Sequence, residues 1–416
     1  MKTGFNCVSM IGLGYIGLPT AAMLASRKIK VVGVDINQHI VDTINRGEIH
    51  IVEPELDIVV KAAVSQGYLR ATTKPEPADA FLIAVPTPFK GNHEPDLNYV
   101  EAAAKSIAPV LKKGDIVILE STSPVGTTEQ MAGWLAQARA DLSFPHQVGE
   151  QADINIAYCP ERVLPGKVVR ELVSNDRVIG GMTQRCSLRA TALYKTFVGA
   201  ECISTNARTA EMCKLTENSF RDVNIAFANE LSVICEKLGI NVWELIKLAN
   251  RHPRVNILQP GPGVGGHCIA VDPWFIVSKT PEEARLIRIA RQVNDRKPHF
   301  VVDQVLAAAA TAADPVIACL GLAFKPDIDD LRESPAMEVV NLLAARKIGQ
   351  ILAVEPHIEE MPASLADFGN IELVSLEEAI RRANIIVMLV SHWSFYAIDR
   401  RLLEDKHIID TRGVWQ

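Results

Sequence analysis

Residues 7–37, CVSMIGLGYIGLPTAAMLASRKIKVVGVDIN, constrain the fold of this chain more than any other segment. An apolar strand at 8–11 leads into a turn with three glycines. An alanine-rich helix then runs to about residue 26, and a second strand at 31–34 ends in Asp35. Gly12 permits the tight turn, Gly14 lets the backbone approach a pyrophosphate, and Gly17 lets the helix pack against the strand. This order predicts a parallel α/β domain of the dinucleotide-binding type.

The same turn predicts where a cofactor binds. The start of the helix directs unpaired N–H groups toward the pyrophosphate of a dinucleotide. Asp35 is placed to accept from both hydroxyls of a ribose, and its charge would repel a 2′-phosphate, so we expect NAD and not NADP. The predicted cofactor contacts of this segment are Gly12, Gly14, Tyr15, Ile16, Gly17 and Asp35.

Further strands of this domain are expected at 79–88 and 115–129, each ending in a loop rich in Thr, Ser and Pro, and at 155–166, where a strand and loop close the domain. Ligands of an open parallel sheet bind beyond the carboxyl ends of its strands, so Thr87, Thr122 and Thr128 are expected to face the cofactor. Helix caps and turn residues are an equally good interpretation of each threonine. The uncharged stretch 4–26 resembles a signal peptide or membrane anchor, but Pro19 and the glycines fit such a segment poorly, so no membrane insertion is expected.

The middle of the chain is predicted to be helical from about residue 206 to 238, because this stretch contains no proline. Apolar residues recur there at helical spacing and form a seam: Val223, Phe227, Leu231 and Ile234. Lys214, Asn218 and Arg221 share another face of the same helix. A polar stripe is commonly just a solvated face, but cations with an amide suit an oxygen-rich ligand.

A loop rich in proline and glycine follows, and it contains the segment GVGGHCIAVDP at 263–273. Cys268 stands there among glycines, which we interpret as room for a substrate to approach its sulfur. His252 and Arg254 lie at the start of the loop. His267, beside the cysteine, could suggest a metal, but no further ligands follow at a suitable spacing, so no metal site is expected.

The last part of the chain repeats the order of the first. Residues 316–358 again read as strand, glycine turn, helix and strand, ending in Glu355, and residues 381–393 parallel residues 77–89. The turn after Gly321 lacks the second and third glycines, so a dinucleotide pyrophosphate would lose its close backbone contact. Lys325 and Arg332 instead suggest side-chain contacts to phosphate, and therefore a second, different nucleotide ligand. Helices around 281–312 are expected to link the two nucleotide-type units.

This combination permits a two-step oxidation. A thiolate can add to an aldehyde, and loss of hydride from the adduct gives a thioester that water cleaves to an acid. Cys268 would be that nucleophile. Lys214 could favour the thiolate and stabilise an oxyanion, and Asn218 could add a donor. Asp272, Thr122 and Glu161 could handle the water and the proton transfers.

Composition and length narrow the classes further. A net charge of −6 leaves no basic footprint for nucleic acid. Eight cysteines without a C-x-x-C pair argue against a disulfide framework or structural zinc and fit a reducing cytoplasm. A chain of 416 residues is too long for one ordinary core. We therefore expect an α/β protein with two Rossmann-like doubly wound domains, at 1–200 and 301–416, joined by a helical central domain at 201–300.

Eight segments together resemble the family of UDP-glucose and UDP-N-acetylmannosamine dehydrogenases over essentially the full length of the chain. They are GLGYIGLP, VPTP, ESTSPVGTTE, CPERVLPG, AEMCKLTENSFRDVNIAFANE, GPGVGGHCIAVDP, GLAFKPDIDDLRESPA and DTRGVW. The resemblance implies a four-electron oxidation of a nucleotide sugar at C6 with two NAD+, a C-terminal domain that binds UDP-sugar, and a homodimer formed through the long middle helix.

The glycine loop departs from the Ser-Cys-Phe-Pro-Lys-Asp pattern usual in UDP-glucose enzymes and is similar to that of bacterial enzymes acting on UDP-N-acetyl-D-mannosamine, which serve enterobacterial common antigen. UDP-glucose and UDP-N-acetylglucosamine stay open as substrates. A hydroxyacid-type dehydrogenase and a non-catalytic NAD-sensing regulator also stay open, and neither would need Cys268. The resemblance assigns Arg332 to the NAD side, where Thr87 and Thr128 are already expected from their place at the strand ends. It assigns to the UDP-sugar Arg162, Val163, Lys214, Asn218, Arg221, His252, Arg254, Gly265, Lys325 and Arg412.

Overall fold

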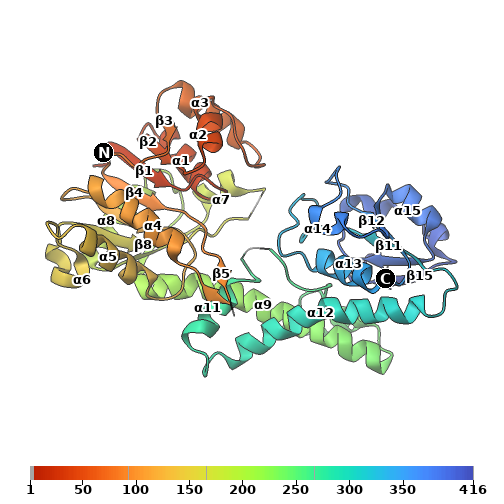
Figure 1. Ribbon diagram of the computed structural model, residues 1–416. Coiled ribbons are helices and arrows are strands. Elements are labelled where there is room, and N and C mark those ends of the chain that lie inside the picture. The colour runs from red at the N-terminus through yellow and green to blue at the C-terminus, as the bar shows by residue number, and fades with distance from the viewer. Residues whose placement is uncertain (1–3, 92, 165, 267, 416) are drawn as a thin grey trace. The chain divides into compact units, whose positions relative to one another are not determined.

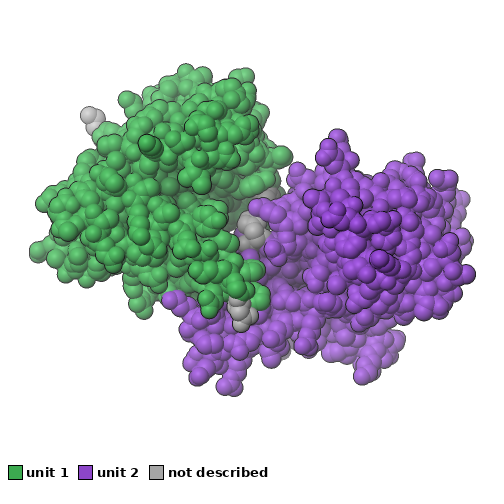
Figure 2. Space-filling model, in the orientation of Figure 1, with its two compact units in different colours: residues 1–216 green, residues 217–416 purple. Residues whose placement is uncertain are grey.

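A computed structural model describes residues 4–91, 93–164, 166–266 and 268–415 (Figure 1). The chain divides into two compact units, residues 1–216 and residues 217–416, which Figure 2 draws in different colours. The boundary falls inside one long helix, α9 (Ala207–Leu238). Each unit has its own sheet and its own apolar core, as expected for a chain of this length.

The first unit is built on an eight-stranded sheet with the order β10-β9-β8-β7-β4-β1-β2-β3. Its neighbouring strands are parallel except β8 and β9, which are antiparallel. The six strands from β3 to β8 therefore follow the doubly wound order 3-2-1-4-5-6. The strands are β1 (Cys7–Ile11), β2 (Lys30–Val34), β3 (Leu69–Thr72), β4 (Ala80–Ile83), β7 (Ile116–Leu119), β8 (Asn155–Tyr158), β9 (Arg177–Gly181) and β10 (Cys202–Asn206); β5 (Phe89–Lys90) and β6 (Glu94–Pro95) form a separate ribbon.

Helices cover both faces of this sheet, so its central strands are buried throughout. One apolar cluster includes residues of α1, α3, α7 and α8, and the other includes residues of α4 and α5 (Figure 1). The helical segments are α1 (Gly17–Ser26), α2 (Gln38–Asn45), α3 (Leu56–Ser65), α4 (Asn98–Ile107), η1 (Ala108–Val110), α5 (Thr127–Ala138), α6 (Pro145–Val148), η2 (Gly149–Gln151), α7 (Val168–Ser174) and α8 (Gln184–Tyr194).

The second unit carries a five-stranded parallel sheet with the order β13-β12-β11-β14-β15. Apolar clusters again lie on both faces. The strands are β11 (Val316–Leu320), β12 (Gln350–Val354), β13 (Ile371–Leu373), β14 (Ile385–Met388) and β15 (His407–Asp410). The helices are α10 (Val242–Ala249), α11 (Asp272–Lys279), α12 (Arg285–Ala309), α13 (Pro335–Arg346), α14 (Ala363–Ala366), α15 (Leu376–Arg382), η3 (Trp393–Ala397) and η4 (Arg400–Leu403).

A buried polar joint ties the C-terminal part of α9 to α12. Arg291 donates to Asp222 at 2.6 Å, and Asn294 donates to the same carboxylate at 2.8 Å. Asn229 donates to Asn294 at 2.8 Å, and all four side chains are buried. Burial raises the pKa of Asp222 to about 6, although the charge of Arg291 opposes that shift. Because buried polar groups need fixed partners, this joint sets the register between the two helices.

The expected fold class is confirmed. A glycine turn follows the first strand of each sheet, and a long helix comes between the two sheets in the order of the chain. Two local expectations are wrong. The first sheet does not close after 155–166, because β9 and β10 extend it, and 281–312 holds one main helix, α12, which continues through Pro298. None of the helices among the described residues has the length and apolar character to cross a membrane.

Candidate active site

The turn after β1 has the geometry expected of a pyrophosphate cradle. Gly12 adopts φ +92°, and a Cβ there would lie 2.5 Å from the carbonyl oxygen of Ala84. A Cβ at Gly17 would lie 1.8 Å from the carbonyl oxygen of Gly12. At Gly14, by contrast, a Cβ would meet no protein atom within 4 Å. The first and third glycines are thus required by packing inside the fold, and the second leaves an open surface for a ligand.

Asp35 stands beside this turn, at the end of β2. Its carboxylate accepts from the backbone N–H of Leu13 at 3.1 Å and from that of Asn37 at 2.9 Å. The side chain stays half-exposed, so it can still accept from ribose hydroxyls. Tyr15 is 36% exposed on the turn, and Ile16 is half-buried at the N-cap of α1. This donor and acceptor set fits a dinucleotide with a free 2′-hydroxyl.

The three candidate threonines are in different surroundings. Thr87 donates its hydroxyl to the carbonyl oxygen of Thr122 at 2.6 Å, which joins the loops after β4 and β7. Thr128 is fully buried, and its hydroxyl donates to the buried carboxylate of Glu211 at 2.6 Å. Glu211 also accepts from the backbone N–H of Gly126 at 2.6 Å and therefore caps α5. The hydroxyl of Thr128 is thus already committed inside the protein, whereas Thr87 and Thr122 lie together at the strand ends.

Glu161 follows β8 and is held by two contacts. One carboxylate oxygen pairs with the buried guanidinium of Arg177 at 2.8 Å, and the other accepts from the backbone N–H of Arg162 at 2.6 Å. Glu161 is 7% exposed. Arg162 and Val163 continue the loop and are half-buried, and Arg162 donates to the carbonyl oxygen of Asp176 at 3.1 Å. The carboxylate of Glu161 is therefore fixed in place by its bonds to Arg177 and to the backbone of Arg162.

Glu120 is a second buried carboxyl near the same arginine, and the sequence did not suggest it. Glu120 accepts from the hydroxyl of Tyr194 at 2.6 Å, and full burial raises the pKa of Glu120 to about 7. The charge of Arg177 and the bond from Tyr194 oppose this shift without cancelling it. Glu120 therefore holds its proton below about pH 7, and Arg177 serves chiefly Glu161 there. Arg177 and Glu120 gave no signal in the sequence because each lies in or directly after an apolar strand.

The polar face predicted on α9 is real but unevenly buried. Lys214 is half-buried in the first unit, Asn218 is buried in the second, and Arg221 is exposed. Asn218 donates to the carboxylate of Asp272, the first residue of α11. Asp272 is 3% exposed. The structure thus brings together two of the residues expected at the reacting carbon, one from α9 and one from α11.

Cys268 is half-buried, and its backbone begins the turn into α11. Its carbonyl oxygen accepts from the N–H of Val271 at 3.0 Å and from that of Asp272 at 2.9 Å. The thiol residue is therefore tied through its own backbone to Asp272, whose side chain bonds Asn218. Because all of these contacts belong to one unit, the second unit holds Cys268, Asn218 and Asp272 in a fixed relationship.

The interpretation of the glycines beside Cys268 is wrong in one respect. A Cβ at Gly265 would lie 2.2 Å from the carbonyl oxygen of Glu333, and one at Gly266 would lie 2.8 Å from the ring of Phe324. A Cβ at Gly263 would lie 2.9 Å from Pro335. On the side where a Cβ would stand, these glycines meet Phe324, Glu333 and Pro335 of the same unit. Because these glycines lack a Cβ, the cysteine loop packs closely against the turn that carries Lys325.

The C-terminal segment meets the same loop. A Cβ at Gly261 would lie 2.4 Å from a guanidinium nitrogen of Arg412, so this arginine lies directly on the backbone before the cysteine. Gly413 has φ +67° and packs against the ring of Trp243. The backbone N–H groups of Arg412 and Gly413 donate to Asp410 at 2.9 and 2.8 Å. Arg412 and Gly265 are thus brought into one region of the second unit with Cys268.

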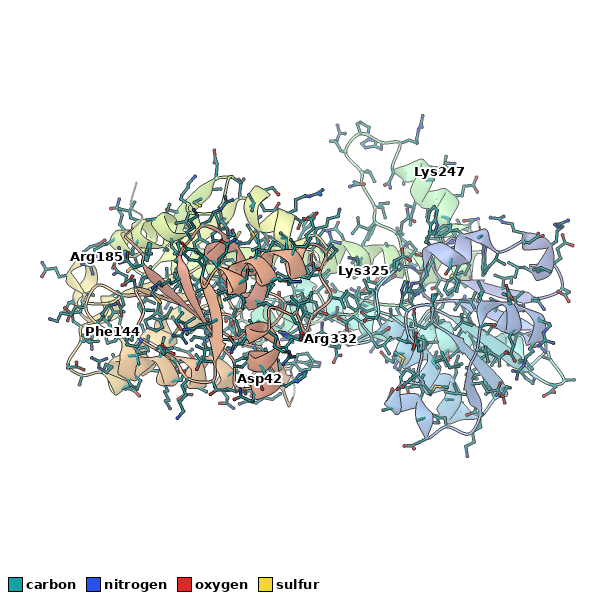
Figure 3. The ribbon with its side chains drawn as sticks, turned by 90° about the horizontal axis from the view of Figure 1, so that it is seen from above. Asp42, Phe144, Arg185, Lys247, Lys325 and Arg332 are labelled. Atoms are coloured by element: carbon teal, nitrogen blue, oxygen red, sulfur yellow. The ribbon has the colours of Figure 1, made fainter. Side chains whose placement is uncertain are left out.

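Lys325 and Arg332 both project from the segment between β11 and α13 (Figure 3). Lys325 is half-buried, and Arg332 is exposed and pairs with Asp330 at 2.6 Å. Glu355 ends β12 as Asp35 ends β2, and it accepts from the N–H of Leu322 at 2.8 Å. His252 and Arg254 lie on the exposed segment after α10, where the N–H of Arg254 donates to His252 at 3.3 Å.

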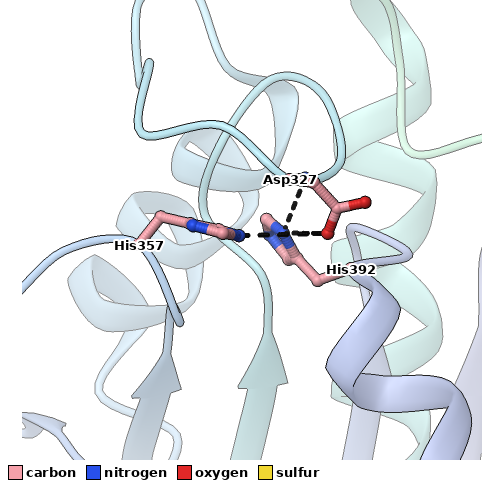
Figure 4. A group of neighbouring side chains, drawn as sticks. All are labelled: Asp327, His357 and His392. Carbon is pink, nitrogen blue, oxygen red and sulfur yellow. Dashed lines mark hydrogen bonds and ion pairs between the residues drawn. The ribbon is translucent and has the colours of Figure 1, made fainter. Parts of the chain in front are cut away.

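In the described part of the chain, Asp327, His357 and His392 offer ligand atoms that all lie within 4.8 Å of one another (Figure 4). However, Nδ1 of His392 accepts from the backbone N–H of Asp327 at 3.0 Å, and Nε2 contacts Glu355 at 3.0 Å. A cation would have to displace one of these bonds, because a neutral imidazole has one lone pair. The group is thus better suited to hydrogen bonding than to metal. His267 lies outside the described residues.

Three family models match successive parts of the chain. They are the NAD binding domain (residues 6–198), the central domain (residues 208–296) and the UDP binding domain (residues 318–416) of the UDP-glucose/GDP-mannose dehydrogenase family. The first match contains the glycine turn and Asp35, the second contains Lys214 and Cys268, and the third contains Lys325. Each nucleotide-type sheet described above therefore coincides with a matched nucleotide-binding model.

Known proteins are similar to the chain over nearly its whole length. An NDP-N-acetyl-D-galactosaminuronic acid dehydrogenase of Ralstonia solanacearum is 67% identical over 100% of this chain and 97% of its own. A UDP-N-acetyl-D-mannosamine dehydrogenase of Yersinia pestis is 68% identical over 99% of this chain and 100% of its own. Among solved structures, a UDP-D-ManNAc dehydrogenase of Pyrococcus horikoshii is 40% identical with a TM-score of 0.87, covering 99% of this chain and 96% of that one.

Proposed function

The chain belongs to the UDP-glucose/GDP-mannose dehydrogenase family, and from that premise we propose that it oxidises UDP-N-acetyl-D-mannosamine at C6 to UDP-N-acetyl-D-mannosaminuronate. It is an NAD-dependent oxidoreductase of nucleotide sugars. The observation that carries the proposal is the fixed group formed by the Cys268 loop, Asn218 and Asp272, in which a cysteine is tied through its backbone to a buried carboxylate that bonds a buried amide. Such a group serves a second oxidation and has no use in a simple alcohol dehydrogenase.

The reaction divides into two oxidations and a hydrolysis. When bound, NAD+ accepts a hydride in each oxidation, and two molecules are used in succession. Between the two oxidations, the thiolate of Cys268 adds to the aldehyde carbon at C6, and the second hydride leaves from the resulting hemithioacetal. The thioester so formed is cleaved by water, which releases the carboxylate and regenerates the thiol. The sum is one primary alcohol, two NAD+ and one water converted to one carboxylate, two NADH and three protons.

The polar residues around the thiol have separate tasks in this scheme. Lys214 places a cation toward the C6 oxygen, where negative charge develops in each step, and Asn218 adds a neutral donor. Asp272 orients Asn218 through their hydrogen bond and can take a proton from the attacking water. Glu161 and Thr122, both residues of the first unit, are assigned to proton transfer with the water and the substrate hydroxyl. The fixed orientation of Glu161 supports its assignment as an acceptor.

The nucleotide ligands follow the two sheets. We assign NAD to Gly12, Gly14, Tyr15, Ile16, Gly17 and Asp35, with Thr87 and Arg332 completing the set. Thr128 is left out of it, because its buried hydroxyl bonds Glu211. We assign the UDP-sugar to Lys325, Arg412, Gly265, Arg162, Val163, Arg221, His252 and Arg254, with Lys214 and Asn218 at the sugar. The domains proposed for these roles are 1–200, 201–300 and 301–416. The eight cysteines form no disulfide with one another, and this together with the use of NAD supports a cytoplasmic location.

The choice of N-acetylmannosamine rests on the named relatives. Enzymes with that name stand at 67–68% identity in several enterobacteria, and solved structures with that name at 40–42%. A second candidate is an N-acetylgalactosamine nucleotide, because the Ralstonia relative is equally similar. UDP-glucose is a weaker candidate, since the solved enzyme so named is 26% identical. A role in enterobacterial common antigen or a comparable surface polysaccharide follows from the first choice.

The proposed function predicts a stoichiometry. Purified protein supplied in turn with UDP-N-acetylmannosamine, UDP-N-acetylgalactosamine, UDP-N-acetylglucosamine and UDP-glucose should turn over the first fastest and form two NADH per sugar consumed. Absorbance gives the NADH, and chromatography of the nucleotide sugars gives the uronate. One NADH per sugar with free aldehyde would contradict the thioester scheme. If another sugar nucleotide is oxidised fastest, the assigned substrate changes, but the thioester scheme still holds.

We also propose that two copies associate through α9. Three apolar side chains of this helix at seven-residue spacing stay exposed: Phe220 is 68% exposed, Phe227 is 53% exposed and Ile234 is 43% exposed. Val223 and Leu231 of the predicted seam are half-buried. Leu286 and Ile289 of α12 add exposed apolar surface in the same unit. A helical face of this kind, repeating every seven residues, fits the same face of a second copy.

Replacing Phe227 by glutamate should convert the dimer to a monomer at micromolar concentration, because two carboxylates would be buried in a symmetric interface. Light scattering on the eluting protein gives the mass. Leu402→Glu is the matched control, since it charges another exposed apolar position of the second unit and should leave the mass unchanged. A Phe227→Glu protein that keeps the mass of two chains would show that α9 is not the interface.

A further inference from the structure

His392 occupies, in the second unit, the place that Thr87 has in the first. β4 and β14 end opposite the last residues of β1 and β11, and Thr87 and His392 each follow four residues later. In the same way, Glu355 takes the place of Asp35. The two units can therefore be compared position by position at their strand ends.

The paired positions behave differently in the two units. Thr87 bonds the carbonyl oxygen of Thr122 and leaves Asp35 half-exposed for a ribose. His392 is fully buried and contacts the carboxylate of Glu355 at 3.0 Å. Glu355 is 5% exposed, and the bond from His392 and those from nearby backbone N–H groups lower its pKa despite its burial. Because this carboxylate is buried, a ribose cannot reach it. In the second unit Glu355 therefore accepts hydrogen bonds from the protein itself, where Asp35 in the first unit faces the cofactor.

The hydrogen bonds define the state of His392. Its Nδ1 accepts from the backbone N–H of Asp327, so the proton of a neutral ring must be on Nε2, where it is donated to Glu355. The ring also lies edge-on to Phe395, with the centroids 5.3 Å apart. Both ring nitrogens are thus in use and one edge of the ring is packed. Figure 4 shows the side of the ring that faces Asp327.

This arrangement fixes the turn that carries Lys325 at both ends. Glu355 accepts from the N–H groups of Leu322 and Ala323, at 2.8 and 3.0 Å, where the turn begins. His392 accepts from the N–H of Asp327, where the turn ends. Asp327 has φ +60°, a left-handed conformation that a residue with a Cβ adopts only when its surroundings hold it there. Lys325 lies between the two anchored ends.

We propose that His392 is a positioning residue for substrate binding: it joins Glu355 to Asp327 and so presents the ammonium group of Lys325 to the diphosphate of the UDP-sugar. The inference rests on the proposed function, which assigns Lys325 to that ligand. Two other interpretations of His392 compete with this proposal. His392 could serve packing alone, or it could belong with His357 and Asp327 to a cation site.

Two substitutions of His392 separate these readings. Asn can place its oxygen near the position of Nδ1 and still accept from Asp327, whereas Gln can place its amide near Nε2 and keep only the bond to Glu355. His357→Asn is the matched control. It removes the neighbouring exposed histidine, which contacts Asp327 at 3.9 Å, and leaves both bonds of His392 in place. Thermal unfolding of all three proteins reports the packing contribution of each change.

The first readout is kinetic. His392→Gln should raise the KM for the UDP-sugar about tenfold, the effect of losing one charged hydrogen bond, because Lys325 is no longer held in place. The kcat and the KM for NAD+ should change less than about twofold, since binding to phosphate is equal in the ground state and the transition state. His392→Asn should recover most of the substrate affinity. His357→Asn should match the unmodified protein with and without added zinc.

The second readout does not depend on the substrate. Amide hydrogen exchange in the peptide covering 321–330 should be faster in His392→Gln than in the unmodified protein and should be restored in His392→Asn. Unchanged exchange and unchanged KM in His392→Gln would overturn the proposal, as would equal losses in the Gln and Asn variants, which indicate packing. A zinc-dependent loss in His357→Asn would also overturn it. If the unmodified protein oxidises no UDP-sugar, the proposed function fails, while the exchange result still decides whether His392 holds the turn.

Discussion

Cys268→Ser should lower steady-state turnover with the UDP-sugar about 10³-fold or more. Serine keeps the shape of the side chain, but its alkoxide is far less available near neutral pH than a thiolate. The first hydride transfer does not use the sulfur, so each active site should still release one slow NADH. Stopped-flow absorbance at an enzyme concentration close to that of the sugar separates this single equivalent from turnover.

The serine protein offers a second measurement. If its hydroxyl adds to the aldehyde, an ester replaces the thioester and hydrolyses more slowly, so intact-protein mass should show a sugar adduct on residue 268. Cys268→Ala should show the single NADH without the adduct. Cys202→Ser, at a half-buried cysteine of the first unit, should behave as the unmodified protein. Near-normal turnover by Cys268→Ser would show that the loop cysteine contributes only to packing, and it would contradict the thioester mechanism.

Lys214→Ala should lower the rate of both oxidations, each by about 10²–10³-fold, the usual loss when one donor to a developing oxyanion is removed. The reason is that the C6 oxygen carries negative charge as the alcohol, the aldehyde adduct and the thioester react in turn. Alanine is a better helix former than lysine, so α9 itself should be unaffected. Lys237→Ala, at an exposed lysine of the same helix, is the matched control and should retain full activity.

The two sites can be tested against each other. In a Cys268→Ser background the single slow NADH reports the first oxidation alone, so adding Lys214→Ala should slow that burst by about the same factor of 10²–10³. An unchanged burst would confine Lys214 to the later steps. It would contradict the role of this lysine as the partner of the C6 oxygen throughout the reaction.

The nucleotide-type folds could be read from local patterns. The strand, glycine turn, helix and acid around Gly12 and Asp35 each impose a backbone or charge requirement within about thirty residues. Such requirements are visible in a single sequence, because only glycine fits where a Cβ would meet a carbonyl oxygen. The helix at 207–238 was predictable for a similar reason, since an uninterrupted helical period needs no partner from elsewhere in the chain.

The partners of the predicted residues were not predictable. Thr128 looked like a cofactor contact, yet its hydroxyl is committed to Glu211, 83 residues later in the chain. Glu161 was expected to handle water and proton transfers, but its pairing with a buried arginine from β9 gave no signal in the sequence. A residue type and its spacing indicate which face a side chain occupies, but not what meets that face.

Local patterns in the sequence specified the fold class, the cofactor turn with its acid, and a thiol in a glycine loop between two nucleotide-type domains. The three-dimensional fold alone showed that Phe324, Glu333 and Pro335 stand where a Cβ on those glycines would lie. It also decided that His392 joins Glu355 to the Lys325 turn, across contacts that span 37 and 65 residues. The physical reason is that backbone conformation and periodicity are local, whereas close packing and the pairing of buried polar groups are satisfied by whichever segment the fold brings alongside.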